Sequence, residues 1–281
     1  MKKLTDKDYW ESIYEVQSES SSRIKLLLRK LASTSFFNFF FRAYYDYLLW
    51  DHVFPESIES LHSGQLVIEI GSAPGDFLVR FSKRFGFTPF GIEYTTYGAS
   101  QNRKAFINND LNPNNVIEQD FFSDEFIFQN KEKFDLVISR GFIEHFENLD
   151  DVIRRHVELI KPGGLLIVLI PNLRGIYWLW TRIFNPEQLK LHNLEIMKLD
   201  SFSRLFELDN ISSLKCSYFG TFGFWLFTAP KESKFVNFII RLLLILQLFL
   251  NFIFRVFFGK KGFETSMFSP NLIYIGRKNL G

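Results

Sequence analysis

The 281-residue sequence has very little cysteine and almost no net charge. Its single cysteine, Cys216, excludes an internal disulfide framework and a cysteine-rich metal site. The formal net charge is +2 and no basic patch stands out, so we expect no nucleic-acid partner. No pair of histidines has the spacing of metal ligands, and we therefore expect no metal site.

A secretory signal is also missing from the sequence as given. The first residues, MKKLTDKDYW, pass from basic to acidic and polar side chains without an apolar core, so a cytoplasmic location is the default expectation. Phenylalanine, in contrast, is abundant, with 35 residues that crowd into segments 36–54 and 235–258. The hydrophobic content of 47% is that of a folded protein.

Short apolar segments alternate with helical ones from residue 65 onward. This alternation predicts a parallel sheet covered by helices on both faces. The strands are expected at 65–70, 88–93, 114–119, 134–139, 164–170, 213–220 and 271–276. The helices are expected at 6–18, 24–33, 36–53, 75–85, 97–108, 148–161, 173–184 and 199–208.

The bend after the first strand, GSAPG, has glycines at 71 and 75. Such a bend lets backbone N–H groups approach a ligand, and both dinucleotides and S-adenosyl-L-methionine use it. The spacing is G-x-x-x-G rather than the G-x-G-x-x-G of dinucleotide sites. Pro74 lacks an amide donor and Asp76 adds a negative charge, which suits a positively charged sulfonium better than a pyrophosphate. A glycine-containing turn without a ligand is the alternative.

Two further acids follow strand ends. Glu93 ends the second strand, where a carboxylate can accept hydrogen bonds from both ribose hydroxyls of either cofactor. Asp120 and Phe121 follow the third strand, where they could bind the amino group of adenine and cover its ring. Each acid alone could be a solvated loop residue, but the series of strand ends favours a ligand site.

The motifs in order are EIGSAPGDF, GIEYT, QDFF, FDLVISRGFIEHF and LIKPGGLLIVLIPN. With this order and spacing, about residues 60–175 resemble the class I (Rossmann-like) S-adenosyl-L-methionine-dependent methyltransferases of the small-molecule type. The resemblance implies an α/β fold: a seven-stranded, mostly parallel, doubly wound sheet of order 3-2-1-4-5-7-6, with strand seven antiparallel. Ala73 stands where many members have glycine.

The resemblance also implies roles for single residues. S-adenosyl-L-methionine would be the cofactor and S-adenosyl-L-homocysteine the product. Tyr9 and Trp10 would close over the cofactor. The remaining assignments are Glu69, Gly71, Ala73 and Gly75 around the methionine moiety, Glu93 and Tyr94 at the ribose, Asp120 and Phe121 at the adenine, and Ser139, Arg140 and Gly141 under the sulfonium.

Catalytic candidates follow the fourth strand and the later loop HNLE. His145 is the first candidate for a general base and Glu144 lies beside it, because histidine titrates near working pH. His192 is a second candidate for base or acceptor binding. For both histidines a packing role is the alternative. An N-P-P-aromatic motif is missing, which argues against nucleobase or amide acceptors.

The apolar segment 235–258 is longer than a methyltransferase fold needs before its last strand. Polar residues interrupt the stretch 242–254, so it does not read as a clear membrane span. At 100° per residue, five polar residues fall within about 120° of arc: Asn237, Arg241, Gln247, Asn251 and Arg255. This pattern predicts an amphipathic helix with a wide apolar face. Three interpretations remain open: a cap packed on helices 24–53, docking to a membrane surface beside GKKG at 259–262, or a homodimer interface.

We therefore expect a methyltransferase that acts on a small, hydrophobic or lipid-like acceptor by in-line transfer. The expected organisation is an N-terminal helical lid at 1–58, a core at 59–230, an apolar helical insert at 231–268, and the last core strand and tail at 269–281. The cytoplasmic protein could then be peripheral to the inner face of the membrane. An NAD(P)-type oxidoreductase and a non-catalytic, cofactor-binding membrane protein are the alternatives.

Overall fold

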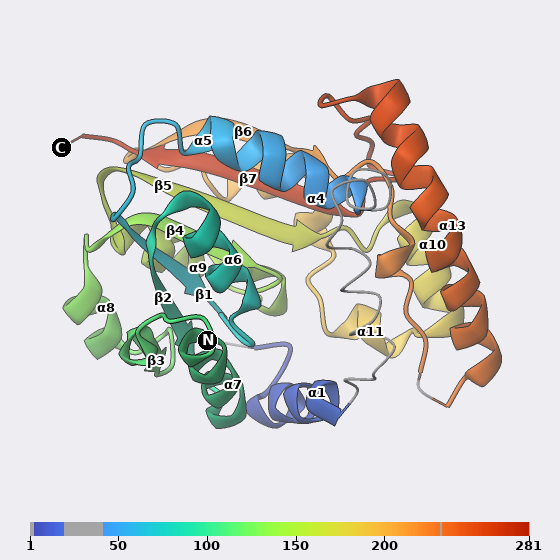
Figure 1. Cartoon of the computed structure of the whole chain (residues 1–281), viewed down its shortest axis with the longest axis horizontal. Coiled ribbons are helices and arrows are strands. Elements are labelled where there is room, and N and C mark those ends of the chain that lie inside the picture. Colours follow the sequence, from blue (N-terminus) through green and yellow to red (C-terminus); the bar gives the residue numbers. More distant parts are fainter. Residues whose placement is uncertain (1–2, 20–41, 231, 281) are drawn as a thin grey trace.

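A computed structural model describes residues 3–19, 42–230 and 232–280 of the chain (Figure 1). The helix expected at 24–33 and the first residues of the one expected at 36–53 lie outside these ranges. The helix α1 (Lys7–Glu19) follows the expectation for 6–18.

A single seven-stranded sheet organises the chain in the order β3-β2-β1-β4-β5-β7-β6. Six of these strands run in the same direction, and β7 runs antiparallel to both of its neighbours, β5 and β6. The predicted strand order and direction are therefore confirmed. The strands are β1 (Leu66–Ile70), β2 (Thr88–Glu93), β3 (Val116–Glu118), β4 (Phe134–Arg140), β5 (Ile160–Pro171), β6 (Ile211–Phe219) and β7 (Asn271–Lys278).

Helices cover both faces of the sheet because successive strand residues point to opposite sides. Val67 and Leu136 belong to one buried cluster, whereas Ile68 and Val137 belong to the other. The cluster around Val67 includes residues of α4 (Tyr44–Leu48), α5 (Phe54–Ser57), α6 (Asp76–Phe85) and α7 (Thr96–Ile107). The cluster around Ile68 includes residues of α8 (Asp124–Asn130), α9 (Leu149–Glu158) and α12 (Leu199–Arg204).

Segment 44–58 differs from the lid that we expected to end at residue 58. It forms α4, a π-helical turn η1 (Leu49–Val53) and α5. Tyr44, Trp50 and Phe54 are almost completely buried in the same cluster as Val67. These three aromatic side chains are therefore part of the core of the sheet domain.

The C-terminal half adds α10 (Gly175–Phe184), α11 (Glu187–Lys190) and α13 (Lys234–Phe258). Helix α13 has 25 residues and forms the helix that we expected in the apolar insert 231–268. Among the described residues, α13 is the one helix whose length and composition would allow it to cross a membrane. Figure 1 places it at the opposite end of the molecule from α8.

Candidate active site

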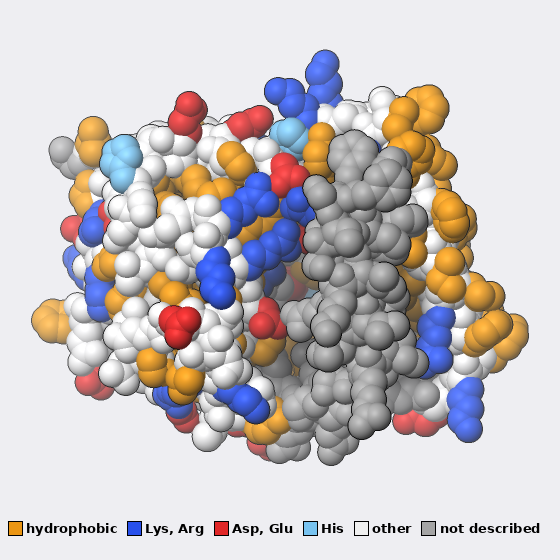
Figure 2. All heavy atoms as spheres, viewed as in Figure 1, with side chains coloured by type: hydrophobic (Ala, Val, Ile, Leu, Met, Phe, Trp, Pro, Cys, Tyr) orange, Lys and Arg blue, Asp and Glu red, His pale blue; other side chains and the backbone are white. Residues whose placement is uncertain are grey.

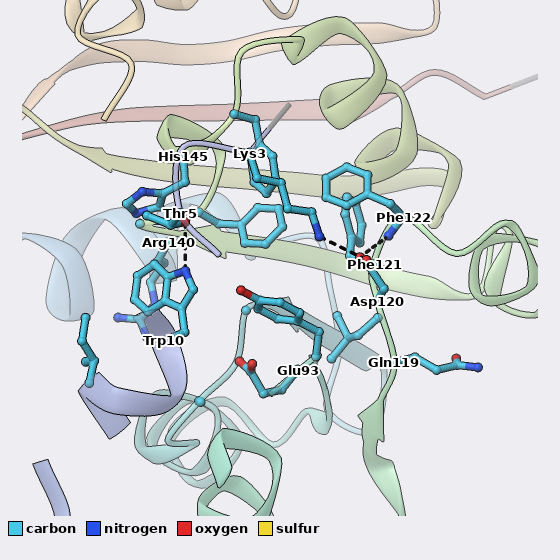
Figure 3. A pocket seen from close by; sticks show the side chains of 18 of the residues that line it. Lys3, Thr5, Trp10, Glu93, Gln119, Asp120, Phe121, Phe122, Arg140 and His145 are labelled. Carbon is cyan, nitrogen blue, oxygen red and sulfur yellow. Dashed lines mark hydrogen bonds and ion pairs between the residues drawn. The ribbon is translucent and has the colours of Figure 1, made fainter. Parts of the chain in front are cut away.

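A cavity of about 300 Å³ opens at the carboxyl ends of β1, β2 and β4 (Figure 3). Open α/β sheets bind ligands at this edge, near the reversal of strand order. The N-terminal segment closes it, since Lys3 pairs with Phe146 as an isolated antiparallel bridge and α1 contacts α7. The lining residues that matter below are Lys3, Thr5, Trp10, Gly71, Ala73, Glu93, Tyr94, Asp120, Phe121, Phe122, Arg140, Phe142, His145 and Phe146.

The bend between β1 and α6 requires its glycines. Gly71 and Gly75 have φ angles of +70° and +97°, in the left-handed region. A Cβ atom on Gly75 would lie 2.3 Å from Oδ1 of Asn102, and one on Gly71 would lie 3.1 Å from the ring of Phe142. Gly71 and Ala73 line the cavity, whereas Gly75 begins α6 behind it.

An ion pair joins the ends of β1 and β4. Arg140 donates from Nε and Nη2 to Oε1 of Glu69 at 2.8 and 2.7 Å. Burial raises the pKa of Glu69, and the Arg140 guanidinium opposes that shift. Oε2 of Glu69 is buried and has no hydrogen-bond partner among the described residues. Arg140 also lies over the ring of Phe77, so its position is fixed from two sides.

Glu93 lines the cavity at the end of β2 and is almost fully buried. Its Oε1 accepts hydrogen bonds from the backbone N–H and the hydroxyl of Thr95, at 2.9 and 2.7 Å. Burial raises the pKa of Glu93, and hydrogen bonds from Thr95, Ala73 and Tyr94 oppose the shift. The carboxylate is thus held in one orientation beside the cavity.

Asp120 forms an ion pair with Lys3, a contact that we did not predict from the sequence. Lys3 lies 3.1 Å from Oδ2 of Asp120 and above the rings of Tyr94 and Phe122. Oδ1 of Asp120 accepts a hydrogen bond from the backbone N–H of Phe122 at 3.0 Å. A basic residue near the N-terminus gave no signal for this contact, because its partner is 117 positions away.

Trp10 lines the cavity, as predicted. Its Nε1 donates to the hydroxyl of Thr5 at 3.0 Å, and its ring meets that of His145 edge-on at 5.1 Å. Tyr9 packs edge-on against Trp10. Helix α1 therefore contributes an aromatic wall next to the first catalytic candidate.

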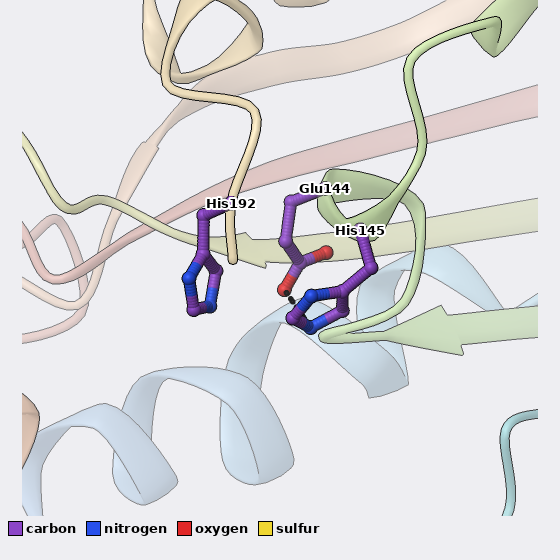
Figure 4. Close-up of side chains that lie close together, drawn as sticks. All are labelled: Glu144, His145 and His192. Carbon is purple, nitrogen blue, oxygen red and sulfur yellow. Dashed lines mark ion pairs between the residues drawn. The ribbon is translucent and has the colours of Figure 1, made fainter. Parts of the chain in front are cut away.

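The fold brings the three catalytic candidates together (Figure 4). Glu144 and His145 lie in the turn η3 (Ile143–His145) after β4, and His192 comes from the loop after α11. Oε1 of Glu144 is 3.9 Å from Nε2 of His145, and the two imidazole rings are 4.7 Å apart. Of the three, His145 lines the cavity, while Glu144 and His192 lie behind it.

Hydrogen bonds fix both imidazoles. Nδ1 of His145 lies 2.8 Å from the carbonyl of Leu191, and Nδ1 of His192 lies 2.8 Å from the carbonyl of Gln188. Each Nδ1 must carry the proton to donate to a carbonyl, so each Nε2 keeps a lone pair. Such an arrangement can accept a proton or ligate a cation.

Burial keeps this cluster neutral. It raises the pKa of Glu144 to about 8 and lowers the pKa of His145 to about 3, a shift that His192 increases and the Leu191 carbonyl opposes. Burial also lowers the pKa of His192. The ligand atoms of the three residues lie within 4.8 Å of one another. Spacing along the sequence, on which we based the expectation of no metal site, did not reveal this proximity.

The predicted cofactor residues divide into two groups. Those at the cavity are Trp10, Gly71, Ala73, Glu93, Tyr94, Asp120, Phe121 and Arg140. Those behind it are Glu69, Gly75 and Ser139; Ser139 is completely buried in the sheet. The aromatic residues of FIEHF, Phe142 and Phe146, also line the cavity and were missed. Their position directly after a strand end was the signal that could have identified them.

A family model described as a methyltransferase domain matches residues 42–214. The [4+2]-cyclase SpnF has a similar structure, with a TM-score of 0.51, 15% identity and coverage of 82% of each chain. Geranyl diphosphate C-methyltransferase from Streptomyces coelicolor A3(2), in complex with Mg2+, geranyl-S-thiolodiphosphate and S-adenosyl-L-homocysteine, has a TM-score of 0.51, 12% identity and coverage of 80% of this chain and 75% of its own. No curated protein matches the sequence.

Proposed function

This chain belongs to the methyltransferase family whose domain model it matches, and from that premise we propose that its acceptor is a small, hydrophobic or lipid-like molecule. The cofactor is S-adenosyl-L-methionine. It supplies an electrophilic methyl group on a sulfonium, and the protein must hold an acceptor in line with it and exclude water. The fold alone would not decide the reaction, since a similar fold serves a cyclase.

One observation carries the proposal: a single cavity collects complementary groups from consecutive strand ends. Glu69 and Arg140 form a paired carboxylate and guanidinium, which would hold the ammonium and carboxylate of the methionine moiety. Oε2 of Glu69 lies behind the cavity lining, has no hydrogen-bond partner among the described residues, and would accept from that ammonium. Glu93 would hold the ribose, and Asp120 with Phe121 the adenine.

The hydrophobic acceptor is inferred from the aromatic lining beside His145. Trp10 meets the imidazole edge-on, and Phe142 and Phe146 pack on each other with their ring centroids 4.9 Å apart. Phe122 packs against Phe146. An apolar acceptor would be stabilised by burial there, whereas a strongly hydrated one would lose its water without replacement.

His145 would take the proton of an oxygen or nitrogen acceptor through Nε2. Its low pKa means that it acts as a transient carrier rather than a stable base. Glu144 carries its own proton below a pKa of about 8, so it would take the proton from His145 only above that pH. At neutral pH the proton would pass from His145 to water. His192 would be a positioning residue that keeps the imidazole of His145 neutral. An acceptor that is already anionic would not need this cluster.

The cofactor assignment can be tested with Glu93→Gln. This variant replaces a charged hydrogen-bond acceptor, so we expect it to weaken S-adenosyl-L-homocysteine binding about 10- to 100-fold by titration calorimetry. Glu118→Gln is the matched control, because Glu118 ends β3, pairs with Arg103 and does not line the cavity. Tighter binding of NAD or NADP than of the adenosyl compound would contradict the cofactor assignment.

The acceptor is best identified by incubating the enzyme with cell extract and methyl-labelled cofactor, then separating organic from aqueous phases. We expect the labelled product in the organic phase, and its loss with His145→Gln but not with the exposed control His62→Gln. Label in the aqueous phase alone would contradict the hydrophobic acceptor while leaving the methyl transfer intact. Added zinc or chelator tests whether the cluster needs a metal: a chelator-sensitive rate would contradict the proton-carrier role.

A further inference from the structure

Helix α13 buries two neutral polar side chains and exposes mainly apolar ones. Its two most buried side chains are Gln247 and Asn251, which are 7% and 3% exposed. Large apolar side chains of the same helix are exposed: Phe235, Phe238, Leu242, Ile245, Leu246, Phe249, Ile253, Val256 and Phe257. Figure 2 shows apolar side chains gathered along the edge of the molecule where Figure 1 places α13. Large exposed apolar patches mark interaction surfaces.

Hydrogen bonds hold the polar stripe of α13 against the domain. Gln247 accepts from the backbone N–H of Phe224 at 2.9 Å and donates to Asn251 at 3.0 Å. Asn251 accepts from the backbone N–H of Tyr44 at 3.2 Å. The hydroxyl of Tyr44 donates to the carbonyl of Gly259 directly after the helix. These bonds fix both the rotation of the helix and its position alongside the domain.

The apolar surface continues beyond α13. The loop at 222–227 touches both α13 and α10, since Phe224 bonds to Gln247 and the N–H of Gly223 donates to the hydroxyl of Tyr177. Trp225 in this loop and Leu179 and Ile183 on α10 are exposed. Helices α10 and α13, together with the loop that contacts both, thus present apolar side chains to the outside.

The charges around this surface are mainly positive. Helix α13 contains no aspartate or glutamate, and its exposed charged residues are Lys234 at its start and Arg241 within it. Lys260 and Lys261 follow its end and are exposed, and Glu232 is the acid near its start. An apolar face flanked by lysine and arginine is complementary to anionic phospholipid headgroups above acyl chains.

We propose that α13 docks the protein on an anionic phospholipid bilayer, where it lies in the plane of the surface with its exposed apolar face among the acyl chains. Its 25 residues would span about 37 Å, enough to cross a bilayer. A crossing helix, however, would have to leave the domain and expose Gln247 and Asn251 to lipid. The in-plane arrangement keeps their bonds and covers the apolar face. This inference does not depend on the acceptor or on methyl transfer.

Vesicle flotation of the full chain tests the docking. We expect the wild type to float with phosphatidylcholine vesicles that contain phosphatidylglycerol, and more weakly with phosphatidylcholine alone. The double variant Ile245→Glu/Phe249→Glu should bind at least about tenfold more weakly, because it replaces two side chains that would enter the bilayer. Phe128→Glu is the matched control: Phe128 is 85% exposed on α8 and should not affect flotation.

Three outcomes would overturn the proposal. The wild type could fail to float with either vesicle, or the double variant could float as well as the wild type. Alternatively, gel filtration could show a wild-type dimer that the double variant dissociates, without any binding to vesicles. That last result would make the face an interface between copies of this chain. Circular dichroism of each variant confirms that it is folded.

The orientation of the helix needs a second measurement. In a Cys216→Ser background, Ser233→Cys and Lys261→Cys place a thiol at either end of α13. With the protein added to preformed vesicles, an impermeant maleimide should label both positions if the helix lies in the plane. Protection of one end in sealed vesicles, removed by detergent, would show that the helix crosses and would overturn the in-plane arrangement.

Discussion

Helix α9 buries Val152 and Ile153 and exposes Arg154, whereas helix α13 buries Gln247 and Asn251 and exposes mainly apolar side chains. Both helices obey the same energetic rule, because apolar surface avoids water and buried polar groups need partners. They differ in what lies on the outer side. For α9 the outer side is water, and for α13 we infer that it is lipid.

The active-site cavity gives a second contrast with α13. Both regions bury polar side chains, but Gln247 and Asn251, the two buried residues of α13, are neutral and hydrogen-bonded to the protein. Directly behind the cavity lining, one buried oxygen each of Glu69 and Glu144 has no partner among the described residues. Satisfied buried polar groups fix structure, while unsatisfied ones leave capacity for a ligand or a proton.

The largest expected effect comes from placing one lysine in each helix and comparing the two losses of stability. Ile153→Lys puts a charge at a completely buried position of α9, and we expect it to lower the free energy of unfolding by about 4 kcal/mol or more. Ile245→Lys, at a position of α13 that is 55% exposed, should change it by less than about 0.5 kcal/mol in the absence of lipid. Urea unfolding followed by circular dichroism measures both.

A large loss of stability with Ile245→Lys would contradict the exposed apolar face. It would mean that this side of α13 is covered by protein in solution. Equal effects of the two substitutions would remove the distinction between the helices altogether.

The second prediction sharpens the contrast at the cavity through pH. In the folded protein Glu144 keeps its proton up to a pKa of about 8, whereas in the unfolded chain it loses it near 4.5. The folded state therefore binds more protons in this window, and the stability contributed by the protonated group falls as pH rises. Glu144→Gln has no proton to lose. The free energy of unfolding of this variant, relative to that of the wild type, should therefore rise by about 1.4 kcal/mol per pH unit between pH 5 and 8.

Thermal or urea unfolding at a series of pH values gives the two curves. Glu147→Gln is a suitable control, because Glu147 is exposed just beyond the turn. Parallel curves for wild type and Glu144→Gln would show that Glu144 is ionised in the folded protein at neutral pH. Glu144 could then take the proton from His145 at neutral pH.

The sequence was sufficient to predict the sheet and the edge of the sheet at which the cavity lies. Strand ends are encoded locally, by an apolar run followed by glycine or an acid, and Gly71, Glu93 and Asp120, predicted at such ends, line one cavity. Lys3 could not be predicted, because its pairing with Asp120 depends on how the N-terminal segment returns over the sheet. The proximity of His192 to His145 depends in the same way on the fold of a later loop.

Helix α13 shows a different limit of reading the sequence. The pattern correctly gathered Gln247 and Asn251 on one stripe, but periodicity cannot say whether a stripe faces water or protein. The cap interpretation packed this helix on helices 24–53 over the acceptor site, but no residue of α13 lines the cavity. The buried hydrogen bond between Asn251 and the backbone of Tyr44 shows that this stripe faces the protein. That contact joins residues far apart in the sequence, so only the tertiary structure reveals it.

The last prediction uses Asn251→Leu to test whether the buried polar side chains of α13 hold it against the domain. In an ordinary surface helix an added leucine at a buried position would stabilise the fold. Here it removes the acceptor for the backbone N–H of Tyr44 and for the amide of Gln247, so we expect a loss of about 1–3 kcal/mol. Leu246→Asn, at a position that is 47% exposed, is the converse control and should cost less than about 0.5 kcal/mol. Urea unfolding of both variants in lipid-free buffer compares them. If Asn251→Leu were as stable as the wild type, the apolar contacts of Phe254 and Phe258 would be holding α13, and its rotation against the domain would no longer be fixed by polar bonds.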